Sequence, residues 1–374
     1  MSSGETADRI ERWREREAAL DRGDMRGHVA GFPDQLARAI EAAAEFAREL
    51  EAGKIPRAIA VVGMGGSAIG GDLVAAASEE RRHLPLVVVR GYDLPSWIDQ
   101  DALVIASSYS GNTEETLSAY GVARERGSRT VAITSGGELA ERAGENDDPI
   151  LALPEGFPPR AAVGWSFAGC AMVAARHDPG LDPEAEADRV RAAAERLRPC
   201  PGEWLAWDGD NPALEIAAGL ENRIPVVYGG HAISVAAALR WKCQLNENAK
   251  MLCWHGALPE QNHNEIAGFE GTSPGPAGRL ALVHLETPWD DPRLSRRFAF
   301  LREYCEGRVA GQHRVEARGD DPLTGMLWLC HLGDCASFLA SVITGNDPTP
   351  VAPIESLKRA LRDRGSEPVT EESA

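Results

Sequence analysis

Two segments rich in glycine and hydroxyl residues carry the groups that bind a phosphate without help from lysine or arginine. In Gly63–Gly70 the glycines let backbone N–H groups approach an anion closely. In Ser107–Thr113 three hydroxyls, from Ser108, Ser110 and Thr113, can donate hydrogen bonds to phosphate oxygens. A helix cap needs one hydroxyl, so the presence of three favours a bound phosphate monoester.

Strands and helices must position these two segments. Ile59–Gly63 reads as a buried strand, and a helix is predicted from Asp72. Leu103–Ala106 is a second such strand, with a helix predicted from Glu114. In an open parallel sheet the loops after the first and third strands can meet at the topological switch point, which would bring both segments to one phosphate.

The first segment has an alternative interpretation as a dinucleotide-binding turn, because Gly63, Gly65 and Ala68 satisfy the pattern G-x-G-x-x-A. Arg90 stands where such a site for NAD has an acidic residue, which disfavours NAD and permits NADP. That interpretation gives Ser107–Thr113 no role. A tight turn without any ligand is the other alternative.

The rest of the chain repeats the alternation of strands and helices. In the first half, further strands are predicted at Leu86–Arg90, Thr130–Thr134 and Ile150–Leu153. After Arg160 the chain is helical as far as a proline-containing linker, Arg198–Pro201. The second half adds strands Ile224–Tyr228, Leu280–Leu285 and His313–Glu316, and helices Val235–Leu245, Arg293–Tyr304, Leu323–Leu339 and Pro353–Arg364. The predicted fold class is α/β, with two doubly wound parallel sheets and a C-terminal helix.

Composition narrows the range of functions. The chain has 374 residues, enough for two domains, and its net charge of −18 excludes a general nucleic-acid binder. The N-terminal segment is polar and no apolar run is long enough to cross a bilayer, which predicts a cytoplasmic protein without membrane contact. The seven cysteines form no C-x-x-C pair, so reduced thiols are expected. The histidines lack the spacing of a metal site.

Four further strings, together with the two segments, carry a resemblance to a known family. They are Pro159–Ala162, Asn246–Lys250, Leu258–Asn264 and Asp347–Val351. In this order the strings resemble the bifunctional phosphoglucose/phosphomannose isomerase family, whose sugar isomerase (SIS) domains bind sugar phosphates. The similarity spans about residues 30–365. It implies an aldose–ketose isomerase that interconverts glucose 6-phosphate and fructose 6-phosphate through a cis-enediol(ate), with no metal or cofactor.

The resemblance also divides the chain into regions. It implies two SIS-type domains, each with a flavodoxin-like parallel sheet, joined by helices. The predicted regions are an N-terminal helical segment (1–30), a first SIS domain with the phosphate loops (31–165), a helical connection (166–201), a second SIS domain (202–346), a C-terminal helix (347–364) and a disordered tail (365–374).

Four side chains match the catalytic positions of the family. The resemblance makes Glu247 the base that moves a proton between C1 and C2. It makes His263, sixteen positions later, the group that opens the sugar ring, supplied by the neighbouring subunit of a homodimer. Arg160 would stabilise the enediolate, and Lys358 would lie near the ring oxygen. Each also has an ordinary interpretation, such as a solvated helix end for Glu247 or a surface loop for His263.

The same resemblance assigns the phosphate to five groups. These are the N–H of Gly66 and the hydroxyls of Ser67, Ser108, Ser110 and Thr113. The alternative to an enzyme is a non-catalytic SIS-domain regulator that binds a sugar phosphate. Such a regulator would need the phosphate loops but none of the four catalytic side chains.

One position departs from the family pattern. Members that act on both epimers have a threonine just before the last helix, and its hydroxyl has been linked to the mannose substrate. Val351, preceded by Pro350, occupies the aligned position here and cannot donate a hydrogen bond. The resemblance therefore implies activity on glucose 6-phosphate and leaves mannose 6-phosphate as an open question.

Overall fold

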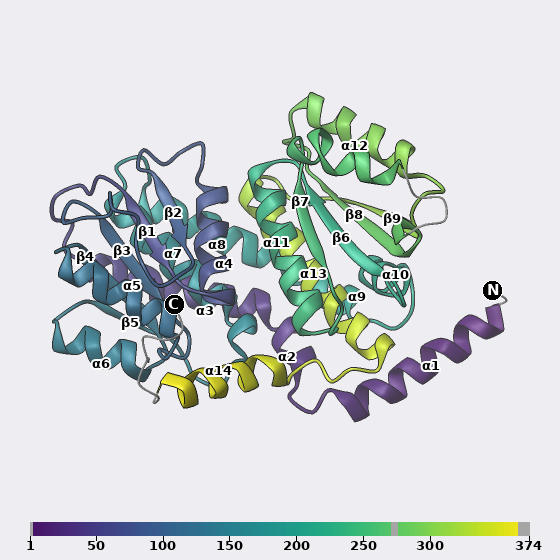
Figure 1. Ribbon diagram of the computed structural model, residues 1–374, viewed down its shortest axis with the longest axis horizontal. Coiled ribbons are helices and arrows are strands. Elements are labelled where there is room, and N and C mark those ends of the chain that lie inside the picture. The colour runs from purple at the N-terminus through teal and green to yellow at the C-terminus, as the bar shows by residue number, and fades with distance from the viewer. Residues whose placement is uncertain (1–2, 271–275, 366–374) are drawn as a thin grey trace, which may run out of the picture.

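Two parallel β-sheets form the framework of the computed structural model, which describes residues 3–270 and 276–365 (Figure 1). The first sheet has the strand order β2-β1-β3-β4-β5 and the second has the order β7-β6-β8-β9. In each sheet, the second strand along the chain lies on one side of the first strand, and the later strands lie on its other side. The strands are β1 (Ile59–Val62), β2 (Leu86–Val89), β3 (Leu103–Ser107), β4 (Arg129–Thr134), β5 (Ile150–Ala152), β6 (Ile224–Gly229), β7 (Trp254–Ala257), β8 (Leu280–Glu286) and β9 (Gly311–Glu316).

Helices connect the strands and cover both faces of each sheet. In the first half they are α1 (Ser3–Leu20), α2 (Met25–Ala30), α3 (Phe32–Glu49), α4 (Gly65–Ala77), α5 (Glu114–Glu125), α6 (Gly137–Glu145), the 3₁₀ turn η1 (Pro159–Ala161), α7 (Val163–His177), α8 (Pro183–Leu197) and α9 (Cys200–Trp204). In the second half they are α10 (Pro212–Gly219), α11 (Ala232–Glu247), the 3₁₀ turns η2 (Glu260–His263), η3 (Glu265–Phe269) and η4 (Pro276–Arg279), α12 (Pro292–Cys305), α13 (Pro322–Thr344) and α14 (Ala352–Gly365).

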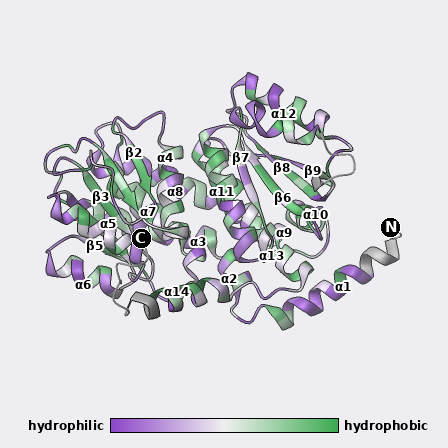
Figure 2. Ribbon diagram, in the orientation of Figure 1, coloured by the Kyte–Doolittle hydropathy of each residue, from purple (hydrophilic) through white to green (hydrophobic). Residues whose placement is uncertain are grey.

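Strand β1 shows why these sequences form a sheet covered on both sides. All four of its residues are buried, which fits a continuous apolar run in a parallel sheet. Because side chains alternate along a strand, Ile59 and Val61 join a large central core, whereas Ala60 and Val62 join a second core on the opposite face. Hydrophobic residues accordingly concentrate in the strands, while polar turns lie on outer helices such as α12 (Figure 2).

A layer of helices lies between the two sheets and shares one core. Residues of α3, α4, α7, α8, α11 and α13 belong to a single cluster of buried side chains that reaches both sheets (Figure 1). The longest of them, α13, is apolar enough and long enough to span a bilayer, contrary to the prediction that no segment is. The whole of that apolar stretch is buried inside the protein, so α13 is a core helix here.

Several predicted boundaries are wrong. Helix α4 begins at Gly65, not at Asp72, so the glycine-rich segment is itself the first turn of the helix. Helix α11 extends to Glu247 instead of ending at Leu245. The edge strand β7, which lacks a strong apolar alternation, is absent from the prediction. The two-sheet α/β class with a C-terminal helix is confirmed.

The domain boundaries given above remain predictions. The tail, apart from Gly365 at the end of α14, lies outside the described residues. All seven cysteines are free thiols, five of them buried.

Candidate active site

The two predicted phosphate-binding segments meet at the carboxyl end of the first sheet. Strands β1 and β3 pair in parallel, so the turns that follow them leave the sheet side by side. A Cβ atom on Gly63 would lie 2.8 Å from the carbonyl oxygen of Ser107, so this approach requires glycine. The backbone N–H of Tyr109 donates to Ser67 Oγ at 3.1 Å, which joins the two turns directly.

The hydroxyl groups of these turns keep protons that can be donated to a ligand. Ser67 and Ser110 accept hydrogen bonds from backbone N–H groups, at 3.1 and 3.3 Å, so each hydroxyl proton can still point toward an anion. Ser108 donates to Thr113 Oγ1 at 3.0 Å, which leaves the proton of Thr113 for a ligand. The arrangement suits an acceptor-rich group such as a phosphate.

Both helices that start here lack a side-chain cap. Helix α4 begins after Met64 and α5 after Thr113, and neither of these residues makes a capping hydrogen bond through its side chain. Thr113 therefore does not serve as an ordinary cap, although its position would allow it. The hydrogen bond between Tyr109 N and Ser67 Oγ holds the start of α4 beside the loop that leads to α5, and the free N–H groups and dipole of a helix N-terminus favour an anion.

Arg160 lies directly beside the first turn. A Cβ atom on Gly66 would lie 2.8 Å from Pro159 O and 3.2 Å from Arg160 Cα, so glycine lets η1 pack against the start of α4. The side chain of Arg160 is only 4% exposed. Burial lowers the pKa of its guanidinium, and the nearby carboxylate of Glu247 opposes that shift. The guanidinium is thus a fixed, poorly solvated cation near the phosphate loops.

Hydrogen bonds fix the guanidinium of Arg160 on two of its three nitrogens. Nε donates to Asn248 Oδ1 at 2.6 Å. Nη2 donates to the carbonyl oxygens of Pro348 and Thr349, at 2.5 and 2.9 Å. Nη1 faces Glu247, with 3.8 Å between Nη1 and Oε2. That separation is too long for a hydrogen bond, so Nη1 keeps donors that could serve an oxyanion.

Glu247 is the last residue of α11, and its side chain is one quarter exposed. The next residue, Asn248, is completely buried and ties this end of α11 to α13 by donating to Ser337 Oγ at 2.9 Å. The carboxylate is therefore reachable from solvent but is carried by a rigid segment. A carboxylate held next to a guanidinium and a phosphate site could remove and return a proton on a bound sugar.

The structure does not bring His263 or Lys358 into this cluster. His263 ends η2 and is exposed; in the described part of the chain no hydrogen bond or ion pair links it to Glu247. Its neighbour Asn264 holds a turn, since its side chain caps η3 by accepting a hydrogen bond from Glu265 N. Lys358 lies on α14, which is exposed along its described side chains and lies at the bottom of the molecule in Figure 1.

Sequence reasoning missed the buried residues that support the site. Arg240 pairs with Asp334 at 2.6 Å and also donates to the carbonyl oxygen of Arg160 at 3.3 Å. Gln244 donates to the same Asp334 at 3.0 Å. These side chains lie on α11 and α13, up to 94 positions apart in sequence. Polar residues on otherwise apolar helices were the one signal that could have found them.

The NADP alternative finds no support at Arg90. Its guanidinium pairs with Asp72 on α4, so the cation that would have to accept a 2′-phosphate is already neutralised. Burial raises the pKa of Asp72 while the contact with Arg90 opposes it. The described residues also contain no group of three His, Cys, Asp or Glu side chains placed to share a metal ion.

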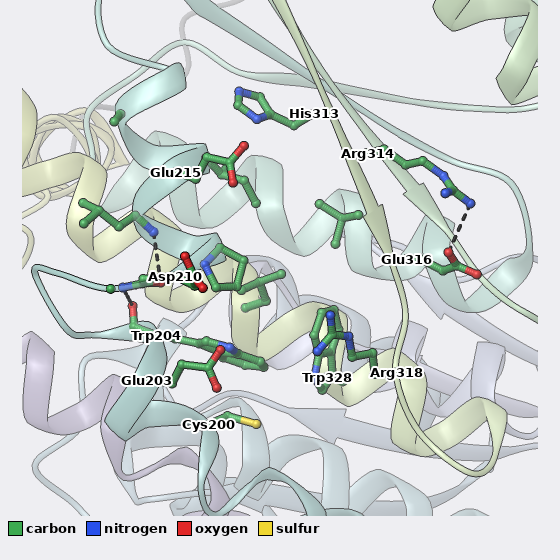
Figure 3. Close-up of a pocket in the computed structure, with 18 of the residues that line it drawn as sticks. Cys200, Glu203, Trp204, Asp210, Glu215, His313, Arg314, Glu316, Arg318 and Trp328 are labelled. Carbon is green, nitrogen blue, oxygen red and sulfur yellow. Dashed lines mark hydrogen bonds and ion pairs between the residues drawn. The ribbon is translucent and has the colours of Figure 1, made fainter. Parts of the chain in front are cut away.

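A cavity of about 1540 Å³ lies elsewhere, between α1, α9, α10 and β9 (Figure 3). None of the predicted site residues lines it. Figure 3 shows carboxylates of Glu203, Asp210 and Glu215 around it, and Arg314 is paired with Glu316 at 3.1 Å. Its lining also carries Arg9, Arg196 and Arg318, so its walls bear charges of both signs.

The loop before α14 contains the position that departs from the family pattern. Val351 immediately precedes α14, and its carbonyl oxygen accepts from Ile354 N at 2.9 Å. The nearest threonine is Thr349, whose hydroxyl packs against the turn at Gly23, where an added Cβ would lie 2.4 Å from Oγ1. Thr349 therefore does not supply the hydroxyl that Val351 lacks.

Known proteins resemble this chain over almost its whole length. Residues 56–156 match the SIS domain, and residues 209–361 match the bacterial phospho-glucose isomerase C-terminal SIS domain. A bifunctional phosphoglucose/phosphomannose isomerase from Caldicellulosiruptor bescii is 36% identical over 340 residues, covering 90% of this chain and 98% of that protein. The protein of the same name from Aquifex aeolicus is 34% identical over 307 residues, covering 82% and 91%.

Solved structures share the fold at lower identity. The hypothetical protein TT0462 from Thermus thermophilus superimposes with a TM-score of 0.69 and 16% identity, covering 96% of this chain and 94% of that chain. At this identity the likeness concerns the arrangement of the two sheets and their helices.

Proposed function

Because the chain belongs to the bifunctional phosphoglucose/phosphomannose isomerase family, we propose that it interconverts glucose 6-phosphate and fructose 6-phosphate. The observation that carries the proposal is the contact between two predicted catalytic side chains, Arg160 and Glu247, beside the hydroxyl-rich turns. The two residues are 87 positions apart in the sequence. Glu247 supplies a negative charge to a buried guanidinium whose hydrogen-bond acceptors, Asn248 and two carbonyl oxygens, are uncharged.

The reaction follows from these groups. The phosphate binds to the N–H of Gly66 and to the hydroxyl protons of the two turns. The Glu247 carboxylate removes the proton from C2 of the open-chain aldose, which leaves a cis-enediolate. The same carboxylic acid returns the proton to C1 from the same face of the planar enediolate, while the proton of the C2 hydroxyl passes to the oxygen on C1. One carboxylate therefore serves both carbons as the base and acid for the carbon-bound proton.

The negative charge on the enediolate oxygen needs a fixed cation. Nη1 of Arg160 can donate to that oxygen, because the other nitrogens already have acceptors. The guanidinium is buried and cannot reorient without breaking three hydrogen bonds. A preorganised donor of this kind stabilises developing charge at little cost in reorganisation.

His263 and Lys358 complete the proposal. Both are exposed in the single chain, which is consistent with contributions made to a site of a second copy or after a rearrangement. We assign ring opening to His263 of a partner subunit in a homodimer, and the ring oxygen to Lys358. A cytoplasmic location is part of the same proposal, supported by seven free thiols.

A coupled assay that follows fructose 6-phosphate formation from glucose 6-phosphate and, separately, from mannose 6-phosphate tests the proposal. Turnover of the glucose substrate is expected. Thermal stabilisation by the sugar phosphate without any turnover would instead identify a non-catalytic regulator. Stabilisation by NADP alone would restore the dinucleotide alternative.

A further inference from the structure

Lys250 occupies a position that normally favours glycine. It follows α11 in the left-handed conformation, with φ of 56°, and Met251 N then donates back to Leu245 O at 3.2 Å. This is the geometry of a helix C-terminal turn in which glycine avoids steric strain. Because a lysine is strained in this conformation, its presence here indicates that the side chain has a functional role.

The ammonium of Lys250 joins two segments of the site. Its Nζ donates to the carbonyl oxygen of Glu247 at 2.6 Å and to that of Pro348 at 3.3 Å. The first carbonyl belongs to the residue proposed as the base. The second belongs to the connection between α13 and α14 and is also bound by Nη2 of Arg160. Two cations thus converge on the Pro348 carbonyl.

We propose that Lys250 is a positioning residue: its ammonium clasps the α13–α14 connection against the end of the helix that carries Glu247. The inference rests on the proposed isomerase function. The clasp holds the Glu247 main chain and, through Pro348, the guanidinium of Arg160 in one arrangement. Another tie, from Asn346 Nδ2 to Ala249 O at 3.0 Å, keeps the connection nearby but reaches neither Glu247 nor Arg160.

The choice of lysine supports this role. The chain has 39 basic side chains, of which only four are lysines (Lys54, Lys242, Lys250 and Lys358). The ammonium is a compact donor on a flexible stem, and here it reaches the carbonyl oxygens of Glu247 and Pro348 together. A simple helix-end cation is the competing explanation, and it would stabilise α11 without affecting catalysis.

The clasp should depend on pH. Partial desolvation, together with the charge of Arg160, lowers the pKa of Lys250 to about 8, while Asp347 and Glu247 oppose the shift. These are the charged groups that face the ammonium from η1, the connection and α11. The charged clasp is therefore complete below pH 8 and weakens as the pH rises through that value.

Stability and activity should change in opposite directions as the pH rises. An unfolded lysine titrates near 10.5, so between pH 8 and 10.5 the unfolded chain binds the extra proton. The free energy of unfolding of the wild type should thus increase with pH, relative to a variant without the side chain, while activity decreases. A lysine with a purely structural role would not lower the activity over this pH range.

Three variants test the proposal: Lys250→Gly, Lys250→Arg and Asn222→Gly. Asn222 has φ of 59° in a turn before β6, so its replacement relieves the same backbone strain away from the site. We measure kcat and KM for glucose 6-phosphate from pH 6 to 10, with the melting temperature of each protein. Lys250→Gly should lower kcat about tenfold at pH 7 with KM changed less than threefold, and should melt no lower than the wild type.

The Lys250→Arg variant tests whether the charge of residue 250 sets the pH dependence of kcat. Lys250→Arg should regain part of kcat and move the alkaline limb of the kcat profile upward by at least one pH unit, because guanidinium stays charged. Asn222→Gly should match the wild type in kcat. Unchanged kcat in Lys250→Gly, or an alkaline limb unchanged by all substitutions, overturns the clasp. Absence of turnover in the wild type would overturn the proposed function instead.

Discussion

The hydroxyl oxygen of Ser67 accepts a hydrogen bond from the backbone N–H of Tyr109 at 3.1 Å, so the start of α4 and the loop after β3 are joined through one side chain. Ser67 is buried, yet its proton has no partner in the described residues. The contact fixes the distance between two helix N-termini and at the same time leaves a donor for a ligand placed between them.

Replacing Ser67 tests this dual role. Ser67→Ala removes a donor to a charged phosphate, a contact worth about 1.5–3 kcal/mol, so KM for glucose 6-phosphate should increase about tenfold or more. Inhibition by inorganic phosphate should weaken in parallel. Ser118→Ala is a suitable control, because that hydroxyl lies on α5 and donates to Tyr92 O at 2.7 Å. An unchanged KM would exclude Ser67 from phosphate binding.

The proposed base can be tested by an isosteric change. Glu247→Gln keeps the shape of the side chain but cannot accept a carbon-bound proton, so kcat should decrease about 10²–10⁴-fold while KM stays within about threefold. Solvent deuterium should enter C2 of glucose 6-phosphate during wild-type turnover and not with the variant. A variant that isomerises at the full rate would remove Glu247 from this role.

The residue before α14 should affect the choice of epimer. Val351→Thr adds a hydroxyl at nearly constant volume, and one new hydrogen bond of about 1 kcal/mol corresponds to about a fivefold gain in kcat/KM. We expect that gain for mannose 6-phosphate and little change for glucose 6-phosphate. Val351→Ala separates loss of packing from gain of a donor. Equal effects on the two substrates would contradict the assignment.

Stability at acid pH should depend on His331. Its two ring nitrogens are buried without a hydrogen-bond partner in the described part of the chain, and the ring stacks on Phe32 with centroids 5.3 Å apart. Burial, together with the charge of Arg240, lowers the pKa of His331 to about 3. Below pH 6.5 the unfolded chain takes up a proton that the folded chain excludes, so folding weakens as the pH falls from 6.5 toward 3.

A denaturation series at two pH values measures this effect. Between pH 6.5 and 5 the wild type should lose about 1.6 kcal/mol more unfolding free energy than His331→Leu, because the unfolded imidazole is already half protonated at pH 6.5. Other buried histidines, such as His284, remain in both proteins and cancel in the comparison. Parallel pH slopes for the two proteins would show that His331 is not the group responsible.

Local pattern predicted much of the fold. Apolar runs located β1, β3, β6 and β8 to within one or two residues, because buried parallel strands need continuous hydrophobic sequence. The start of α4 was misjudged, since Gly65 and Gly66 are poor helix formers in isolation. Gly65 opens the helix with a left-handed φ of 52°, and Gly66 packs closely against η1, a contact between residues about 94 positions apart.

The residues around the candidate site were less accessible to sequence reasoning. Hydroxyl and glycine clusters are local, so Ser67 and Thr113 could be recognised directly. The guanidinium of Arg160 is held by the side chain of Asn248, just after α11, and by two backbone carbonyls after α13, and the sequence does not reveal which main-chain oxygens will accept a hydrogen bond. Lys250 belongs to the string Asn246–Lys250 that carries the family resemblance. Its positioning role, however, could be inferred only from its backbone conformation and its contacts in the structure.

The complete burial of α13 has a consequence for dissecting the protein. This helix packs on α11 and α10 but also on α8, α2 and α4, which precede it by more than a hundred residues. A fragment that ended before α13 would expose the surfaces that this helix covers, and one that began after α9 would expose the side of α13 that packs on α8, α2 and α4. We therefore expect neither half to be soluble when expressed alone, and co-expression of both halves to restore a single cooperative unfolding transition.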